Sequence, residues 1–195
     1  MREATQRRKQ RIWSVINRRQ KDLTLIMDNI HDPHNVSAVM RSCDAFGVSR
    51  ILLYYTHEEF PILGRKSSAS AIKWVETCEH SDAAAMIHPL REEGYQILST
   101  GFGEGSLPLP EWDLSRPTAV IFSNEHSGIS EELKHWVDRE MYIPMQGMIQ
   151  SLNVSVAAAI TLYEAWRQRR DRGMYQAPSM DLESREAMFR DWCEK

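Results

Sequence analysis

Hydrophobic residues recur along the chain in short runs that predict buried β-strands. Five runs rich in β-branched and aromatic residues lie at 23–27, 51–55, 95–98, 119–122 and 141–143. Apolar residues at helical spacing predict helices at 83–90 and 153–170, and a further helix whose buried face carries Val36, Val39, Met40, Cys43 and Phe46. Strands that alternate with helices are typical of an α/β fold with a mostly parallel sheet and flanking helices.

Both ends of the chain are predicted to add a helix to this core. Residues 3–20 have a helical pattern, but only Trp13, Val15 and Ile16 form an apolar stripe. We therefore expect this helix to dock loosely or on a partner. A last helix is predicted at 182–193. The interpretation is an N-terminal arm (1–20), one domain (21–175) of a size that supports a single core, and a C-terminal helical extension (176–195).

The formal charge is distributed unevenly. The whole chain carries −3 at pH 7, yet its first 20 residues hold seven basic residues and one acid. Such a run is either a solvated helix face or an arm that binds a polyanion, and composition leaves both open.

Composition argues against several classes of protein. No apolar run is long enough for a membrane span, and the charged N-terminus has no apolar stretch behind it, so we expect a cytoplasmic protein without a membrane partner. Cys43, Cys78 and Cys193 are far apart and form no CxxC pair, which argues against a disulfide framework or a zinc site. We expect no metal.

Two polar loops follow predicted strands, where open parallel sheets bind ligands. The loop at 28–35 leads into a helix that we expect to begin at Asn35, with Arg41 inside it. An arginine beside an apolar stripe more often extends into solvent than acts chemically. The loop at 101–105 is GFGEG, but Pro108 and Pro110 follow it, so no helix N-terminus is available to bind a pyrophosphate.

Two more loops have mixed polar and apolar character. The loop at 123–128 places Glu125 between a buried strand and a helix near Ser130, where an acid also simply favours the helix dipole. In the loop at 143–153, Pro144 and Gly147 interrupt regular structure. Its apolar side chains and free backbone groups suit a small molecule with polar and apolar parts. Like Asn35, Asn153 precedes Val-Ser and is expected to be an N-cap.

Three segments together resemble the TrmH family of tRNA guanosine ribose 2′-O-methyltransferases, within the SPOUT superfamily. They are HNVSAVMRSCDAFG at 34–47, AVIFSNEHSG at 119–128 and IPMQGMIQSLNVSVAAAI at 143–160. The likeness continues through 18–24 and 162–175. The resemblance implies an α/β fold with a C-terminal trefoil knot that holds S-adenosylmethionine, and a homodimer with its active sites beside the subunit interface.

The resemblance also implies a set of site residues. The catalytic positions would be Asn35, Arg41, Glu125, Ser151 and Asn153. The S-adenosylmethionine contacts would be Thr100, Ile143 and Leu152, with Gly101, Ser123, Gly128 and Met145 nearby. Many relatives have glycine at the position of Ser123, where a side chain adds volume and a hydroxyl beside the cofactor.

The same resemblance gives the arginines of the chain their expected tasks. The family's arginine, here Arg41, is taken to activate the ribose hydroxyl, but a guanidinium keeps its proton in proteins. We therefore expect Arg41 to hold an adjacent phosphate and to stabilise alkoxide charge. The residues expected to contact tRNA phosphates are Arg8, Lys9, Arg11, Arg19, Arg167 and Arg169.

The expected substrate is guanosine 18 in the D-loop of tRNA. Two alternatives stay open at this point. One is the same chemistry on another tRNA position or on ribosomal RNA, and the other is a noncatalytic RNA-binding protein or chaperone with the same fold.

Overall fold

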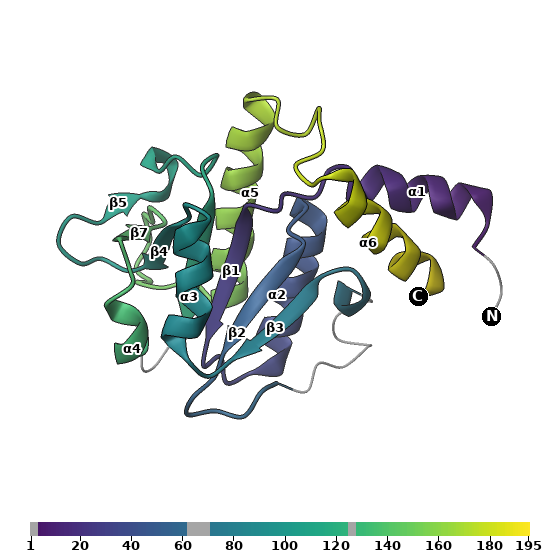
Figure 1. Ribbon diagram of the computed structural model, residues 1–195. Coiled ribbons are helices and arrows are strands. Elements are labelled where there is room, and N and C mark those ends of the chain that lie inside the picture. The colour runs from purple at the N-terminus through teal and green to yellow at the C-terminus, as the bar shows by residue number, and fades with distance from the viewer. Residues whose placement is uncertain (1–3, 62–70, 125–127) are drawn as a thin grey trace.

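A parallel sheet lies at the centre of the computed structural model, which describes residues 4–61, 71–124 and 128–195. In these ranges seven strands stand in the order β3-β2-β1-β6-β4-β7-β5, and each neighbouring pair is parallel (Figure 1). The strands are β1 Leu23–Asp28, β2 Arg50–Tyr54, β3 Glu76–His80, β4 Gln96–Thr100, β5 Leu107–Pro108, β6 Thr118–Ser123 and β7 Arg139–Tyr142. The helices are α1 Gln6–Ile16, α2 Pro33–Phe46, α3 Ala83–Glu92, α4 Glu131–Lys134, α5 Val154–Asp171 and α6 Leu182–Glu194, with short 3-10 helices η1 Ala71–Lys73 and η2 Leu109–Glu111.

All five predicted strands are confirmed to within two residues, and the structure adds β3 and β5. The sequence of β3, ETCEH, contains no apolar run, because this strand lies at one edge of the sheet and none of its residues is fully buried. Strand β5 at the other edge has only two residues, so it leaves no periodic pattern.

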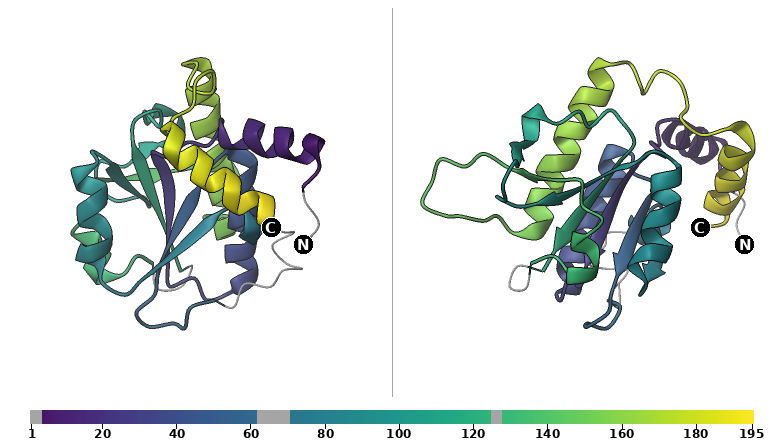
Figure 2. Two further views of the ribbon diagram at one scale, coloured as in Figure 1. Left: turned by 45° about the vertical axis from the view of Figure 1, so that its right-hand side comes forward. Right: turned by 60° about the vertical axis from the view of Figure 1, so that its left-hand side comes forward.

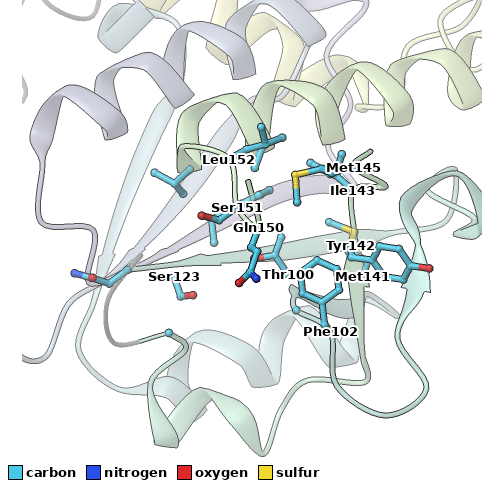
Figure 3. A pocket seen from close by; sticks show the side chains of 16 residues that line it. Thr100, Phe102, Ser123, Met141, Tyr142, Ile143, Met145, Gln150, Ser151 and Leu152 are labelled. Carbon is cyan, nitrogen blue, oxygen red and sulfur yellow. The ribbon is translucent and has the colours of Figure 1, made fainter. Parts of the chain in front are cut away.

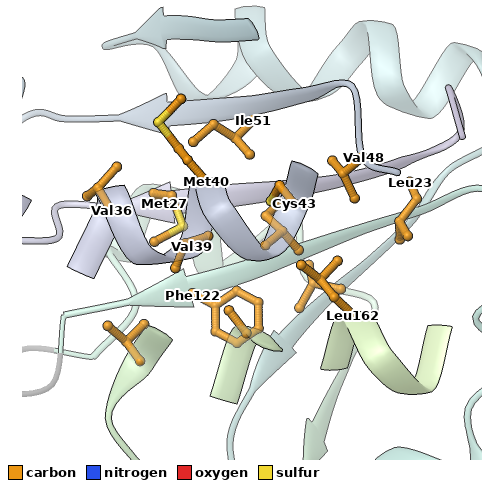
Figure 4. Close-up of a cluster of buried hydrophobic side chains, with 14 of the residues drawn as sticks. Leu23, Met27, Val36, Val39, Met40, Cys43, Val48, Ile51, Phe122 and Leu162 are labelled. Carbon is orange, nitrogen blue, oxygen red and sulfur yellow. The ribbon is translucent and has the colours of Figure 1, made fainter. Parts of the chain in front are cut away.

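The core has two layers, one on each face of the sheet (Figure 2). Helices α2 and α5 cover one face, where Met27 of β1 packs with Met40 and Leu162 (Figure 4). Helices α3 and α4 cover the other face, where Ile26 packs with Ile87 and Leu133. Because side chains alternate along a strand, a strand that is buried on both faces needs an unbroken apolar run, which is the pattern in the sequence.

Helix α2 begins two residues before the predicted start at Asn35. Asp32 is its N-cap and accepts a hydrogen bond from the His34 backbone N–H at 2.8 Å. Pro33 takes the first helical position, where its missing N–H has no cost. The expectation for Asn153 is confirmed, because its side chain caps α5 by accepting from the Ser155 N–H at 2.9 Å. None of the helices that the structure describes is long and apolar enough to cross a membrane.

Helix α1 packs against α6 of the same chain, beside the end of the sheet where β1 begins (Figure 1). This corrects the expectation of a loose helix or one docked on a partner. The apolar side of α1 includes Ile12, which together with Ile16 packs against Trp192 of α6. Trp13 adds an edge-to-face contact with Phe189, at 5.4 Å between ring centroids.

Candidate functional site

A cavity of about 300 Å³ opens at the carboxyl ends of β6, β4 and β7, which are neighbours in the sheet. Four segments line it: the loop after β4, the loop after β6, the loop after β7 and the first turn of α5. Parallel strands deliver all these loops to the same edge of the sheet, although the segments lie far apart in the sequence. The cavity is of the size at which small-molecule sites begin.

The structure brings together most of the predicted catalytic and cofactor-binding residues. The cavity is lined by every residue predicted to contact S-adenosylmethionine and by one predicted catalytic residue: Thr100, Gly101, Ser123, Gly128, Ile143, Met145, Leu152 and Ser151. Their joint presence around one cavity was not a consequence of their sequence spacing alone. It requires the loops after β4, β6 and β7 to converge.

The cavity wall has an apolar side and several polar groups. Leu152, Met145 and Ile143 lie along one side, while Phe102 and Tyr142 lie together at one end (Figure 3). Thr100, Ser123, Asn124, Gln150 and Ser151 supply hydroxyl and amide groups. This combination fits a ligand that carries both an apolar surface and hydrogen-bonding groups. The described residues contain no group of three or more His, Cys, Asp or Glu side chains placed to hold a metal ion.

Sequence reasoning missed several residues of the wall, among them Phe102, Tyr142 and Gln150. Phe102 is 68% exposed and its ring lies 5.2 Å from that of Tyr142. A signal for Phe102 was present in the sequence, since an aromatic residue between two glycines just after a strand has little structural reason to be there. Gly103 is held by Glu140, whose carboxylate accepts from its backbone N–H at 2.6 Å.

Glycine leaves room for this carboxylate. A Cβ atom added at Gly103 would lie 2.7 Å from Glu140 Oε2, closer than real Cβ contacts allow. Gly101 and Gly103 therefore leave room for the carboxylate of Glu140 from β7, which would have to move if either position carried a side chain. This is a different use from the dinucleotide loop that the sequence weakly suggested.

Asn35 and Asn153 meet next to the cavity. Asn153 Nδ2 donates a hydrogen bond to Asn35 Oδ1 at 3.1 Å. Asn153 Oδ1 meanwhile accepts from the backbone and the hydroxyl of Ser155, so the whole Asn153 amide is engaged. Asn35 is not the N-cap that was predicted, but it is on the first turn of α2 and is tied to the first turn of α5.

Arg41 is exposed on α2 and does not line the cavity. No hydrogen bond or ion pair joins its guanidinium to any other residue that the structure describes. Its charge is thus available to an external anion. Glu125, the remaining predicted catalytic residue, lies outside the described residues.

Two of the six cations predicted to contact tRNA are buried, which corrects the prediction for Arg19 and Arg169. Arg19 donates to the backbone oxygen of Val48 at 2.7 Å and pairs with Asp44, and its side chain has no solvent exposure. Burial lowers the pKa of Arg19, and the Asp44 carboxylate opposes that shift.

Arg169 is equally enclosed by hydrogen-bond acceptors. It donates to Leu114 O at 2.9 Å and Arg116 O at 3.0 Å, and it pairs with Asp22 at 2.5 Å. Such arginines hold loops together and present no donor to a phosphate.

The other four predicted contacts are nearer to solvent. Arg8 and Arg11 are exposed on α1, and Lys9 is partly exposed. Arg167 is partly exposed, and its guanidinium pairs with Glu164 at 2.7 Å and with Asp171 at 3.3 Å.

Comparisons with known proteins point in one direction. Residues 22–163 match the family model described as SpoU rRNA Methylase family. The chain is 42% identical over 195 residues to the tRNA (guanosine(18)-2'-O)-methyltransferase of Thermus thermophilus, with both chains covered completely. It is 38% identical over 193 residues to the enzyme of the same name from Aquifex aeolicus, covering 96% of this chain and 89% of the relative.

Solved structures agree with these matches. The crystal structure of the Aquifex aeolicus TrmH/SpoU tRNA modifying enzyme superposes with a TM-score of 0.89 at 36% identity, over 96% of this chain and 95% of that one. The SpoU methyltransferase AviRb of Streptomyces viridochromogenes, solved in complex with AdoMet, superposes with a TM-score of 0.68 at 25% identity. That match covers 78% of this chain and 62% of AviRb.

Proposed function

The chain belongs to the SpoU rRNA Methylase family, and we propose that it transfers a methyl group from S-adenosylmethionine to the ribose 2′-hydroxyl of guanosine 18 in the D-loop of tRNA. The observation that carries this proposal is the match of 42% identity over the full length of a tRNA (guanosine(18)-2'-O)-methyltransferase. The predicted cofactor residues lie far apart in the sequence, yet all of them line one cavity. Their convergence supports the proposal.

The cavity fits the cofactor by its chemistry. Backbone and hydroxyl groups at Thr100, Gly101 and Ser123 suit the polar parts of S-adenosylmethionine, and Ile143, Met145 and Leu152 suit its adenine and carbon chain. When bound, S-adenosylmethionine supplies a methyl group that its sulfonium charge makes electrophilic. Gly128 also lines the cavity.

The chain itself has two tasks, which are to position the ribose and to assist the loss of its proton. We assign an electrostatic role to Arg41. Its guanidinium holds an adjacent RNA phosphate and stabilises developing negative charge on the 2′-oxygen. Its exposure and its lack of an ion pair to another described residue support this assignment. A phosphate oxygen or water accepts the proton.

The other catalytic positions hold the pocket in shape. Asn35 and Asn153 fix the first turns of α2 and α5 relative to each other through their 3.1 Å hydrogen bond. Ser151 orders the wall between them, and Glu125 is proposed to do the same from the loop after β6.

The tRNA-binding surface in this proposal consists of Arg8, Lys9, Arg11 and Arg167. These residues position the phosphates without reading bases. The acidic partners of Arg167 would compete with RNA, so its contribution is the smallest of the four. Because tRNA is the substrate, we propose that the enzyme works in the cytoplasm.

We further propose a homodimer and a trefoil knot in the C-terminal part of the chain, as the family resemblance implies. Val156, Ile160 and Tyr163 support the dimer, because they lie on one face of α5 and are exposed in the single chain. Apolar side chains at this spacing form a stripe that a second copy can cover.

The proposed function is tested with tRNA that lacks the modification and S-adenosylmethionine with a tritiated methyl group. We expect incorporation into tRNA, loss of incorporation when guanosine 18 lacks its 2′-hydroxyl, and no incorporation into ribosomal RNA. Methylation of another nucleotide or of ribosomal RNA would assign a different substrate. RNA binding without incorporation would favour the noncatalytic alternative.

A further inference from the structure

Asn29, the residue after β1, has a backbone conformation that needs support from its surroundings. Its φ of 48° makes it the single non-glycine residue with positive φ among those that the structure describes. Asparagine tolerates this left-handed region better than most residues, but such a conformation still persists only where the neighbouring structure enforces it. Asn29 is also buried, with 6% of its surface exposed.

The side chain of Asn29 joins the loop after β1 to the loop after β2. Its Oδ1 atom accepts from three successive backbone N–H groups, those of Thr56, His57 and Glu58, at 3.0, 3.1 and 3.3 Å. Its backbone N–H donates to Tyr54 O at 2.9 Å. One amide oxygen thereby accepts hydrogen bonds from three N–H groups near the start of the loop after β2.

The same residue joins these loops to the loop after β6. Asn29 Nδ2 donates to Asp28 Oδ1 at 2.9 Å and to Ser130 Oγ at 3.1 Å. The carbonyl oxygen of Asn29 accepts from Asn124 Nδ2 at 3.2 Å. Asn124 is itself part of the cavity wall, so one bond separates Asn29 from the cavity.

Asp28, the last residue of β1, completes this network. Its carboxylate has no solvent exposure and accepts from the Ser130 backbone N–H at 2.6 Å and from Ser130 Oγ at 2.5 Å. A buried carboxylate is tolerated only when hydrogen bonds satisfy it, and Asn29 supplies one of them.

We propose that Asn29 is a positioning residue for methyl transfer. It holds Asn124 and Ser130, which follow β6 beside Ser123 and Gly128 of the cavity, in place relative to the loop after β1. That loop leads into α2, which carries Asn35 and Arg41. Cofactor and ribose must be aligned by elements that come from these two loops, and Asn29 contacts both. This inference rests on the proposed function for its effect on turnover, but not for its effect on cofactor binding.

The decisive variant is Asn29→Gly. Glycine adopts a positive φ freely, so the backbone conformation is kept while every hydrogen bond of the side chain is lost. We expect S-adenosylmethionine to bind several-fold more weakly by calorimetry. We expect kcat for tRNA methylation to fall about 10- to 100-fold, because small misplacement of reacting groups has effects of this size, while the Kd for tRNA changes less than about twofold.

The matched control is Asp82→Ala. Asp82 caps α3 by accepting from the Ala85 N–H at 3.0 Å, and this bond is independent of the three loops. Its loss lowers the melting temperature by a few degrees without touching the network, so it shows what a general loss of stability does to activity. Cofactor affinity and kcat should stay at wild-type values in this control.

A third variant, Asn29→Asp, keeps part of the network. Its carboxylate can still accept from the N–H groups of 56–58, but it cannot donate to Asp28 or Ser130 and it places a second negative charge beside Asp28. We therefore expect kcat to fall as it does in Asn29→Gly, and a wild-type kcat in this variant would overturn the role of the bonds to Asp28 and Ser130.

The outcomes are distinguishable. Wild-type cofactor affinity and kcat in Asn29→Gly would overturn the inference, as would equal losses in Asp82→Ala. If the wild-type protein binds S-adenosylmethionine but methylates no tRNA, the proposed function fails. The calorimetric comparison of Asn29→Gly with the wild type still decides whether Asn29 shapes the cavity.

Discussion

Asn153 and Asn35, which are 118 positions apart in the chain, are joined by a hydrogen bond of 3.1 Å between their side-chain amides. Each residue lies at the start of a long helix on the same face of the sheet, α5 and α2 respectively. The bond therefore fixes the distance between the cavity wall at Ser151 and Leu152 and the helix that carries Arg41. The two asparagines share this role. The sequence pattern predicted both as helix caps, and the family resemblance predicted both as catalytic positions.

Replacement of Asn153 separates its two roles. Asn153→Ser keeps an N-cap but is too short to reach Asn35, whereas Asn153→Ala loses both functions. We expect Asn153→Ala to lose about 1 kcal/mol of stability in chemical denaturation and Asn153→Ser to lose only a few tenths. Both variants should lower the single-turnover methylation rate by about tenfold or more. Wild-type turnover in Asn153→Ser would show that the bond to Asn35 has no role in catalysis.

Arg41→Ala tests the assignment of charge stabilisation. Removal of a preorganised cation from the transition state is expected to slow single-turnover methylation by about 100-fold or more, with the melting temperature unchanged because the side chain is exposed. Arg190→Ala, an exposed arginine on α6, is the control for the loss of one positive charge. A rate within twofold of the wild type would reject the role, and full activity in Arg41→Lys would show that a point charge is sufficient.

Much of the fold could be predicted because burial on both faces of a parallel strand leaves an unbroken apolar run. This holds for β1, whose six residues are all buried, and fails for β3, where an edge position permits a polar sequence. The cofactor cavity could be predicted only through the family motifs. No local pattern reveals that the loops at 100–102 and 143–152 share a wall, since that depends on strand order.

The basic residues show a different limit. Arg19 and Arg169 lie in runs of arginines that look solvent-exposed, yet both are fully buried among backbone carbonyl oxygens. An arginine with five donors can satisfy several chain ends at once, and the sequence does not indicate which arginine in a run does so. Phe102 was missed for the converse reason, because an exposed aromatic residue in a loop follows no periodicity.

The buried and exposed arginines should respond differently to substitution. Arg169→Ala leaves the Asp22 carboxylate and the backbone oxygen of Leu114 without their arginine donor, so we expect a loss of about 3–5 kcal/mol in the free energy of unfolding. Arg8→Ala combined with Arg11→Ala should leave stability unchanged and should flatten the dependence of log K for tRNA on log salt by about one unit per lost phosphate contact. An unchanged salt slope would remove α1 from the tRNA interface.

A charge on the exposed face of α5 tests the proposed dimer. Ile160→Glu places a carboxylate at the centre of the stripe formed with Val156 and Tyr163. We expect the wild type to have twice the chain mass by light scattering and the variant to be monomeric, because a desolvated charge is costly at an interface. The control is Gln10→Glu, which introduces the same charge at an exposed position of α1, outside this stripe. A monomeric wild type, or a variant that stays dimeric, would count against this interface.

The pairing of His31, in the loop that precedes α2, with Glu58 depends on pH. Its Nδ1 atom lies 3.0 Å from Glu58 Oε2, and this hydrogen bond, with the charge of Glu58, raises the pKa of His31 above its ordinary value near 6.5. A raised pKa in the folded state means that the pairing is fully present below about pH 6.5 and is lost as the pH rises through the folded pKa. NMR titration of the imidazole should therefore give a higher pKa in the wild type than in Glu58→Gln. Glu59→Gln, which removes the same charge one residue further on, should leave most of the shift in place, and an identical titration of His31 in the wild type and Glu58→Gln would show that the pair does not form in solution.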